Sequence, residues 1–100
     1  MYFITVFEKL EPDKFVFVKH GDKRTWGYYP EYQTAVNALH EDRCGMHEGC
    51  YRYAVVEKIG YGITAHVESR QWFKWDEDKS GFFEIKEPEC VKHVTNFAIG

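Results

Sequence analysis

The arrangement of apolar and polar residues along this chain predicts one helix among several strands. Apolar residues recur at helical spacing between Tyr32 and Leu39, which indicates one apolar stripe on a helix. Pro30 suits the first helical position because its missing N–H needs no partner there, and Gly45 suits the left-handed residue that ends a helix. The sequence therefore predicts a principal helix at about residues 30–44, with its stripe facing a sheet.

Runs of β-branched and aromatic residues predict strands on both sides of this helix. The expected strands cover residues 2–9, 14–20, 24–29, 51–59, 70–76, 81–86 and 94–99, with a loop at 60–69 and one helical turn at 89–93. A short turn separates the first two strands, which predicts an antiparallel hairpin that begins the sheet. The predicted fold class is α+β: an antiparallel sheet of about five to seven strands with the one principal helix packed on one face, in two layers.

Composition limits the chain to one domain. One hundred residues with 44% hydrophobic and 18% aromatic content suffice for one core but not for two ordinary domains. We therefore expect residues 1–100 to form a single domain. No apolar run approaches the roughly 20 residues that span a bilayer, and the N-terminus has no basic leader, so we expect a soluble intracellular protein with no membrane partner. Three cysteines, an odd number, favour free thiols or a metal over a disulfide framework.

Charge is concentrated in one segment. The net charge is −3, and residues 76–89 carry six acidic and two basic side chains. A chain with a pI near 5.9 is a poor candidate for binding nucleic-acid backbones, so we expect no direct nucleic-acid partner. A basic protein partner is easier to accommodate. The predicted closing strand 94–99 would also allow a homodimer if it lay at a sheet edge.

The densest group of reactive side chains follows the helix. His40, Cys44, His47 and Cys50 lie within eleven residues, and residues 90–93 repeat the C-x-x-H spacing of Cys44 and His47. Two such pairs brought together would suit tetrahedral zinc, although no C-x-x-C occurs and the spacings match no standard finger. The alternative is a Cys44 buried against the core and a His47 that is surface-exposed or hydrogen-bonded.

The acidic segment contains a second candidate metal site. Asp76 to Glu87 fits the twelve-residue calcium-loop pattern, with oxygen side chains at loop positions one, three, five, nine and twelve and glycine at six. Such a loop needs an entering and an exiting helix, whereas the preceding residues are strand-like and Pro88 follows. The alternative is a hairpin turn whose acidic side chains are solvated.

The residues that follow the helix also include the side-chain types that activate a thiol. A thiol at Cys44, an imidazole at His47 and a carboxylate at Glu48 lie within five residues. Catalytic Cys and His usually come from separate parts of a fold, so we favour a protein that is not an enzyme and expect no cofactor.

The chain has more large aromatic residues than one side of a thin sheet can bury, and several of them lie beside basic residues. This composition is typical of protein-interaction hot spots and of pockets that stack a nucleotide base. For any single ring, core packing is the simpler alternative. The candidate binding residues are Arg24, Trp26, Tyr28, Arg43, Cys44, His47, Glu48, Trp72, Lys74, Trp75, Asp76 and Asp78.

Several stretches together are similar to one family. They are RTWGYY at 24–29, RCGMHE at 43–48, YAVVE at 53–57, WFKWDE at 72–77, GFFEI at 81–85 and the terminal KHVTNFAIG. Together they resemble a family of short uncharacterised proteins of gut Firmicutes and of their phages and mobile elements. The resemblance covers nearly the whole chain and implies no established activity.

The resemblance implies a small accessory protein that acts by binding in the cytoplasm of a bacterial host, a class that includes inhibitors of bacterial defence. We expect stoichiometric binding to a host protein, such as a nucleic-acid-handling defence enzyme, through exposed aromatics and the acidic segment 76–89. Two alternatives stay open. One is a protein that sequesters a nucleotide-like signal, with Arg24, Arg43 or Arg70 holding phosphate. The other is a zinc- or thiol-dependent enzyme centred on Cys44 and His47.

Overall fold

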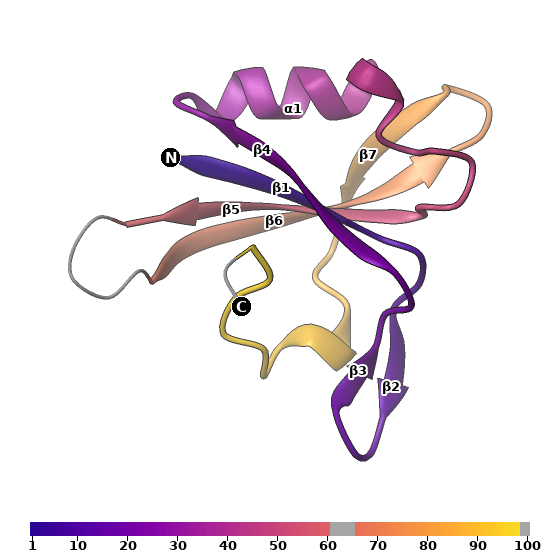
Figure 1. Cartoon of the computed structure of the whole chain (residues 1–100), viewed down its shortest axis with the longest axis vertical. Helices are drawn as coiled ribbons and strands as arrows, with labels where there is room; N and C mark the ends of the chain where they lie inside the picture. Colours follow the sequence, from indigo (N-terminus) through magenta and orange to yellow (C-terminus); the bar gives the residue numbers. More distant parts are fainter. Residues whose placement is uncertain (61–65, 99–100) are drawn as a thin grey trace.

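The computed structural model describes residues 1–60 and 66–98, and its centre is a twisted antiparallel sheet (Figure 1). The five strands lie in the order β4-β1-β5-β6-β7. They are β1 (Tyr2–Phe7), β4 (Lys23–Tyr29), β5 (Tyr53–Ile59), β6 (Val67–Asp76) and β7 (Gly81–Ile85). A separate small sheet pairs β2 (Glu11–Asp13) with β3 (Phe17–Lys19). Helix α1 (Tyr32–His40) packs on one face of the large sheet, which confirms the predicted α+β class.

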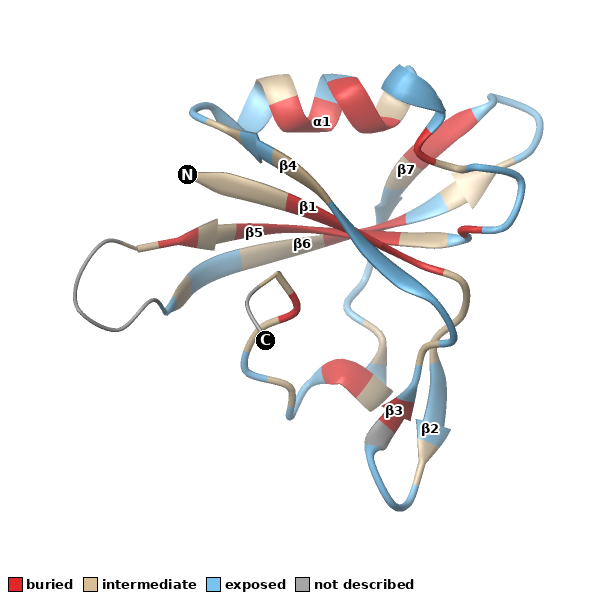
Figure 2. Ribbon diagram, viewed as in Figure 1, coloured by how far each residue is buried: buried red, intermediate tan, exposed pale blue. Residues whose placement is uncertain are grey.

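The two faces of the large sheet carry separate apolar clusters. On the helix side, Ile4 and Val6 of β1 pack with Ala35 and Leu39 of α1, so the predicted helical stripe is confirmed. On the opposite side, Trp72 packs with Phe7 of β1 and with Phe97 of the C-terminal segment. Figure 2 shows buried residues running through the middle of the sheet between these two layers. The two-layer expectation was therefore incomplete, because residues 89–98 cover the second face.

The predicted hairpin between residues 2–9 and 14–20 is wrong. Strand β1 instead lies between β4 and β5, a central position that fits its burial on both faces. The segment 14–20 contributes only β3, which turns back onto β2. The carboxylate of Asp13 accepts hydrogen bonds from the backbone N–H groups of Phe15 and Val16, at 2.8 and 3.2 Å, and so closes a tight local turn. Phe15 at that turn is 83% exposed.

The helix begins at Tyr32, so Pro30 is not its first residue as predicted, and it ends at His40 rather than at residue 44. Glu41 caps it, with its N–H directed at carbonyls of the last turn, and Asp42 then adopts a left-handed conformation with φ of 49°. Gly45, predicted to end the helix, lies instead in the 3₁₀ turn η1 (Arg43–Gly45). The helical periodicity was correct, but the chain reverses earlier because Asp42 leaves helical geometry.

Four other predictions from the sequence concern elements near the candidate sites. Strand β6 begins at Val67, so the predicted loop 60–69 is wrong at its end, and residues 61–65 lie outside the described residues. The hairpin between β6 and β7 is confirmed. The predicted helical turn appears as the 3₁₀ turn η2 (Glu89–Val91). The predicted closing strand is wrong over residues 94–98, which form no strand, and with it the reason for a homodimer through that strand is lost.

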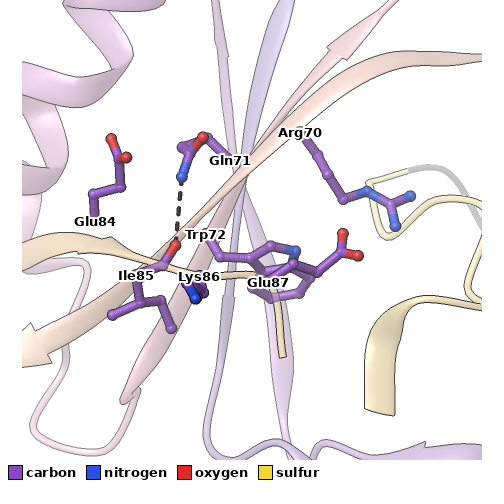
Figure 3. A pocket seen from close by; sticks show the side chains of 7 residues that line it. All are labelled: Arg70, Gln71, Trp72, Glu84, Ile85, Lys86 and Glu87. Atoms are coloured by element: carbon purple, nitrogen blue, oxygen red, sulfur yellow. Dashed lines mark hydrogen bonds between the residues drawn. The ribbon is translucent and has the colours of Figure 1, made fainter. Parts of the chain in front are cut away.

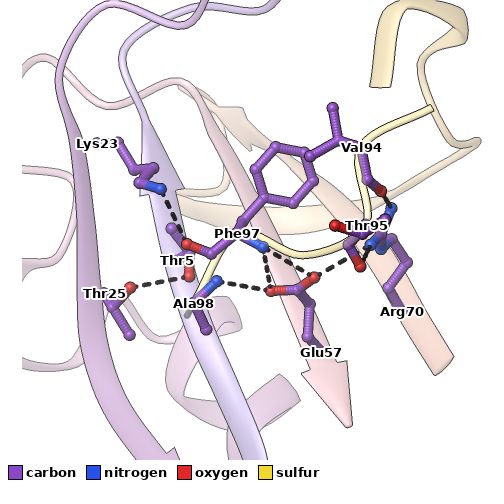
Figure 4. Close-up of polar contacts among 9 residues, drawn as sticks. All are labelled: Thr5, Lys23, Thr25, Glu57, Arg70, Val94, Thr95, Phe97 and Ala98. Carbon is purple, nitrogen blue, oxygen red and sulfur yellow. Dashed lines mark hydrogen bonds and ion pairs between the residues drawn. The ribbon is translucent and has the colours of Figure 1, made fainter. Parts of the chain in front are cut away.

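Side chains rather than a strand ladder hold the C-terminal segment on the sheet (Figure 4). Glu57 of β5 is 0% exposed, and its carboxylate accepts hydrogen bonds from the N–H groups of Phe97 and Ala98, each at 3.0 Å. Arg70 of β6 lies 3.3 Å from the same carboxylate and donates to the carbonyl oxygens of Val94 and Thr95 at 2.9 and 2.7 Å. The buried carboxylate is thus both paired and hydrogen-bonded, as burial of a charge requires.

Candidate functional site

The corner loop, residues 41–52, joins α1 to β5 with an unusual backbone. Asp42, Cys44 and Glu48 all have positive φ, between 47° and 60°. Left-handed geometry is unfavourable for residues with a Cβ, so neighbouring contacts must hold it. Two buried side chains of the loop, Met46 and Tyr51, belong to the helix-side core. The loop is therefore a fixed corner whose exposed residues have defined positions.

His47 connects the corner loop to the end of β6. Its ring stacks on Trp75 with centroids 3.7 Å apart and planes 7° from parallel. Its backbone N–H donates to the Asp42 carboxylate at 2.9 Å, while its buried Nε2 has no hydrogen-bond partner among the residues that the structure describes. Burial and the nearby Arg52 guanidinium lower the pKa of His47, against the opposing influence of Asp42 and Glu77. The imidazole therefore favours its neutral form in this stack.

Two ion pairs extend these contacts to both sides of the corner loop. Arg24 of β4 lies 3.1 Å from Glu48 and places its guanidinium over the Trp26 ring, 5.6 Å from the centroid. Arg52 lies 2.7 Å from Glu77 in the β6–β7 turn. These pairs are exposed, so they contribute little to stability and their strength falls with salt. We call the surface formed by residues 23–26, 41–52 and 74–80 the rim.

The structure brings most of the predicted binding residues to the rim but not all. Arg43 is there, paired with Glu41 at 2.6 Å, and Lys74 lies over the ring of Tyr53. Tyr28 is 62% exposed but lies farther along β4, against Phe3. The residues placed at the rim are Arg24, Trp26, Arg43, Cys44, His47, Glu48, Lys74, Trp75, Asp76 and Asp78.

Trp72 is the clear exception among the predicted rings. It is 1% exposed and packs between Phe7 and Phe97, so it is a core residue and the expectation of an exposed ring is wrong here. Arg70, a candidate phosphate ligand, is already engaged by Glu57 and by two backbone carbonyls.

The two C-x-x-H pairs lie in different layers of the fold. Met46, between Cys44 and His47, is buried on the helix side, whereas Cys90 packs against the opposite cluster. Within residues 1–60 and 66–98, no three Cys, His, Asp or Glu side chains are grouped as a metal site. Cys44 is exposed, so the expectation that it is buried against the core is also wrong.

The calcium-like sequence folds as a hairpin. Asp76 ends β6, its carboxylate accepts the N–H of Lys79 at 3.1 Å, and Gly81 begins β7. A calcium loop would wrap its oxygens around one point, whereas Glu84 lies within strand β7. The alternative of a turn with solvated acidic side chains fits this geometry.

The thiol-enzyme hypothesis finds no supporting contact in the described part of the chain. The ring of His47 lies flat on Trp75, and its Nε2 makes no hydrogen bond to Cys44 or to any other group there. A base that activates a thiol needs hydrogen-bond contact with it. The exposed thiols of Cys44 and Cys50 therefore have no aligned general base.

Sequence reasoning missed three residues that organise this region. Arg52 and Glu77 hold the corner loop to the β6–β7 turn, but no local motif marks a pair so far apart in the chain. Glu57 did carry a signal, because it is a lone carboxylate within a strand whose other central residues are apolar.

Comparison with known proteins finds no matching family model, no matching curated protein and no matching solved structure. In residues 1–60 and 66–98, no helix has both the length and the apolar character needed to cross a membrane.

Proposed function

We propose that this protein is a small binding protein that attaches stoichiometrically to a bacterial host protein through the rim. The observation that carries the proposal is the joining of three separate segments into one surface by the His47–Trp75 stack and the Arg24–Glu48 and Arg52–Glu77 ion pairs. Side chains held in place before binding lose less conformational entropy when a partner docks. Such a surface suits recognition better than chemistry.

The acidic segment 76–89, of which residues 76–80 belong to the rim, favours a basic partner. Glu77 and Asp78 are exposed in the β6–β7 turn, and Glu84 and Glu87 are exposed along and just after β7. Complementary charge speeds encounter and orients the two proteins, which suits docking on the basic groove of a nucleic-acid-handling enzyme. Together with the family resemblance, this favours a phage- or mobile-element-derived inhibitor of a host defence enzyme.

The proposal is tested by affinity capture from a bacterial lysate with three forms of the tagged protein. The rim variant carries Glu77→Lys and Asp78→Lys, which reverse two exposed charges of the β6–β7 turn and break the Arg52–Glu77 ion pair. The matched control carries Glu11→Lys and Glu31→Lys, two exposed glutamates that lie outside the rim. We expect one host protein to be enriched by the wild type and the control but lost with the rim variant.

Equal capture by all three forms, or no host protein above background, would overturn the proposal. The defence-inhibitor part is tested by phage plating on hosts that express each form. Wild type and control are expected to raise plating efficiency on a defence-carrying host, and the rim variant is expected to leave it unchanged.

A further inference from the structure

Strand β6 is longer than the strand that pairs with its outer edge. It has ten residues, of which β5 pairs with Val67–Lys74 on one side. On the other side β7 pairs only with Trp72–Asp76, because β7 ends at Ile85 opposite Trp72. Among the described strands none pairs with the outer edge of residues 67–71. Alternate N–H and C=O groups along such an edge point away from the sheet and are available to another strand.

Two hollows lie along this free edge and share Arg70 and Gln71. The larger, about 380 Å³, is the notch left where the chain departs from β6 after Ile85 (Figure 3). The smaller, about 190 Å³, lies toward the helix side and is lined by Tyr2 and Tyr32. Both are lined by β6 residues between Ser69 and Trp72, so a chain added along this edge would pass beside both hollows.

The notch also contains buried hydrogen-bond donors without partners. Trp72 is 1% exposed, lines the notch, and its indole Nε1–H makes no hydrogen bond to any group in residues 1–60 and 66–98. The Nε–H of Arg70 is likewise buried and without a partner in that part of the chain, although the rest of the guanidinium is fixed by Glu57 and by the carbonyls of Val94 and Thr95. Buried donors are almost always paired, so these two donors are available to an acceptor that enters the notch.

The charges around the notch are balanced, which bears on the chemistry of that acceptor. Arg70 and Lys86 oppose Glu84 and Glu87. A charged ligand would therefore gain little, whereas the neutral carbonyls of a peptide backbone match both the orphan donors and the strand edge. Glu87 lines the same notch (Figure 3), and this exposed side chain can rotate aside.

We propose that the free edge of β6 at Val67–Gln71 binds an extended peptide segment of a partner protein as an added antiparallel strand. The peptide continues the line of β7, its main chain bonds to the β6 edge, and one of its carbonyls enters the notch to accept from Trp72 Nε1. Strand addition of this kind takes affinity from backbone hydrogen bonds and specificity from side-chain hollows beside the edge. This site is separate from the rim and does not depend on the function proposed for it.

The test begins by panning a displayed library of random heptapeptides against the full-length protein. One enriched peptide is then synthesised and titrated into isotope-labelled protein. We expect the indole N–H signal of Trp72 to shift while those of Trp26 and Trp75, both at the rim, stay in place. Backbone amides in Val67–Gln71 should gain protection from hydrogen exchange, and those of the other edge strand, Lys23–Tyr29, should not.

A matched pair of variants makes the result specific. Trp72→Phe removes the indole donor while keeping an aromatic ring, and it should weaken peptide binding about tenfold, the effect of losing one hydrogen bond to a buried donor. Trp75→Phe should leave the affinity unchanged. The absence of any enriched peptide, or protection of Lys23–Tyr29 in place of Val67–Gln71, would overturn the proposal. Unchanged affinity in a folded Trp72→Phe protein would refute the role of the indole.

Discussion

The carboxylate of Glu57 and the backbone N–H of Phe97 lie 3.0 Å apart in a fully buried position, and this contact fastens the C-terminal segment to the centre of the sheet. Arg70, whose side chain is 13% exposed, completes the arrangement from the neighbouring strand. The pair thereby closes the second apolar layer around Trp72.

Glu57→Gln should lower the free energy of unfolding by about 3 kcal/mol, because it breaks a buried ion pair and leaves the Arg70 charge uncompensated. Chemical denaturation measures the change. Glu68→Gln is the matched control, since Glu68 pairs with Lys58 at 3.7 Å and both side chains are 44% exposed. That exposed pair should contribute at most about 1 kcal/mol. Equal effects of the two substitutions would contradict the structural role given to Glu57.

The His47–Trp75 stack should make stability depend on pH. Burial and Arg52 lower the folded-state pKa of His47 below its ordinary value of 6.5. Above pH 6.5 both folded and unfolded states carry a neutral imidazole, and the stack contributes fully. As pH falls below that value the unfolded chain takes up a proton that the folded state resists, so stability declines until the folded-state pKa is passed.

Melting temperatures recorded between about pH 8 and about pH 5 test this dependence. His47→Gln cannot take up the proton, so its melting temperature should fall less over the same range. Parallel curves for the wild type and His47→Gln would show that the stack does not depress the pKa.

Gly81→Ala should destabilise the protein by about 2 kcal/mol, since overpacking against rigid groups costs that order of free energy. A Cβ at this position would collide with the backbone carbonyl oxygen of His40 and approach the Phe83 ring at 3.2 Å. The neighbouring Ser80 has φ of 52°, so Ser80→Gly should act in the opposite direction and stabilise by about 1 kcal/mol. Thermal denaturation of the two variants measures both changes in stability. A Gly81→Ala protein as stable as the wild type would contradict the close contact.

The three thiols should react at different rates. Burial raises the pKa of Cys90, whereas Cys44 and Cys50 are exposed. Because the thiolate is the reactive form, alkylation at about pH 8 should label Cys44 and Cys50 before Cys90. Mass spectrometry of peptides at timed intervals identifies each site, and unfolding the protein in denaturant should abolish the difference. Early labelling of Cys90 in folded protein would contradict its packing.

Local sequence patterns predicted which helices and strands form better than they predicted which strands pair. The helical stripe and the β6–β7 hairpin could be read from periodicity, because each depends on neighbours close in sequence. The strands that pair with β1 could not be predicted from the sequence, since burial on both faces fits several positions in a sheet. The segment 94–98 has the composition of a strand, but its backbone is held by side-chain hydrogen bonds from Glu57 and Arg70. These contacts are distant in sequence, so no local pattern predicts them.

At the candidate site, too, local features could be predicted from the sequence and tertiary features could not. Composition singled out the corner loop and the acidic segment, and the structure joins them through His47 and Trp75. Composition could not tell an exposed ring from a buried one, so the ring of Trp72 was expected to be exposed although it packs in the core. The free edge of β6 depends on where β7 ends, a tertiary property without a sequence signature.

The position of Phe97 has a consequence for synthesis of the protein. Its ring covers Phe7 and Trp72, both of which leave the ribosome well before it. Until Phe97 emerges, the Phe7 and Trp72 rings lack this part of their cover, and exposed apolar surface on an incomplete chain promotes aggregation. The second apolar cluster can therefore be completed only after Phe97 has been synthesised.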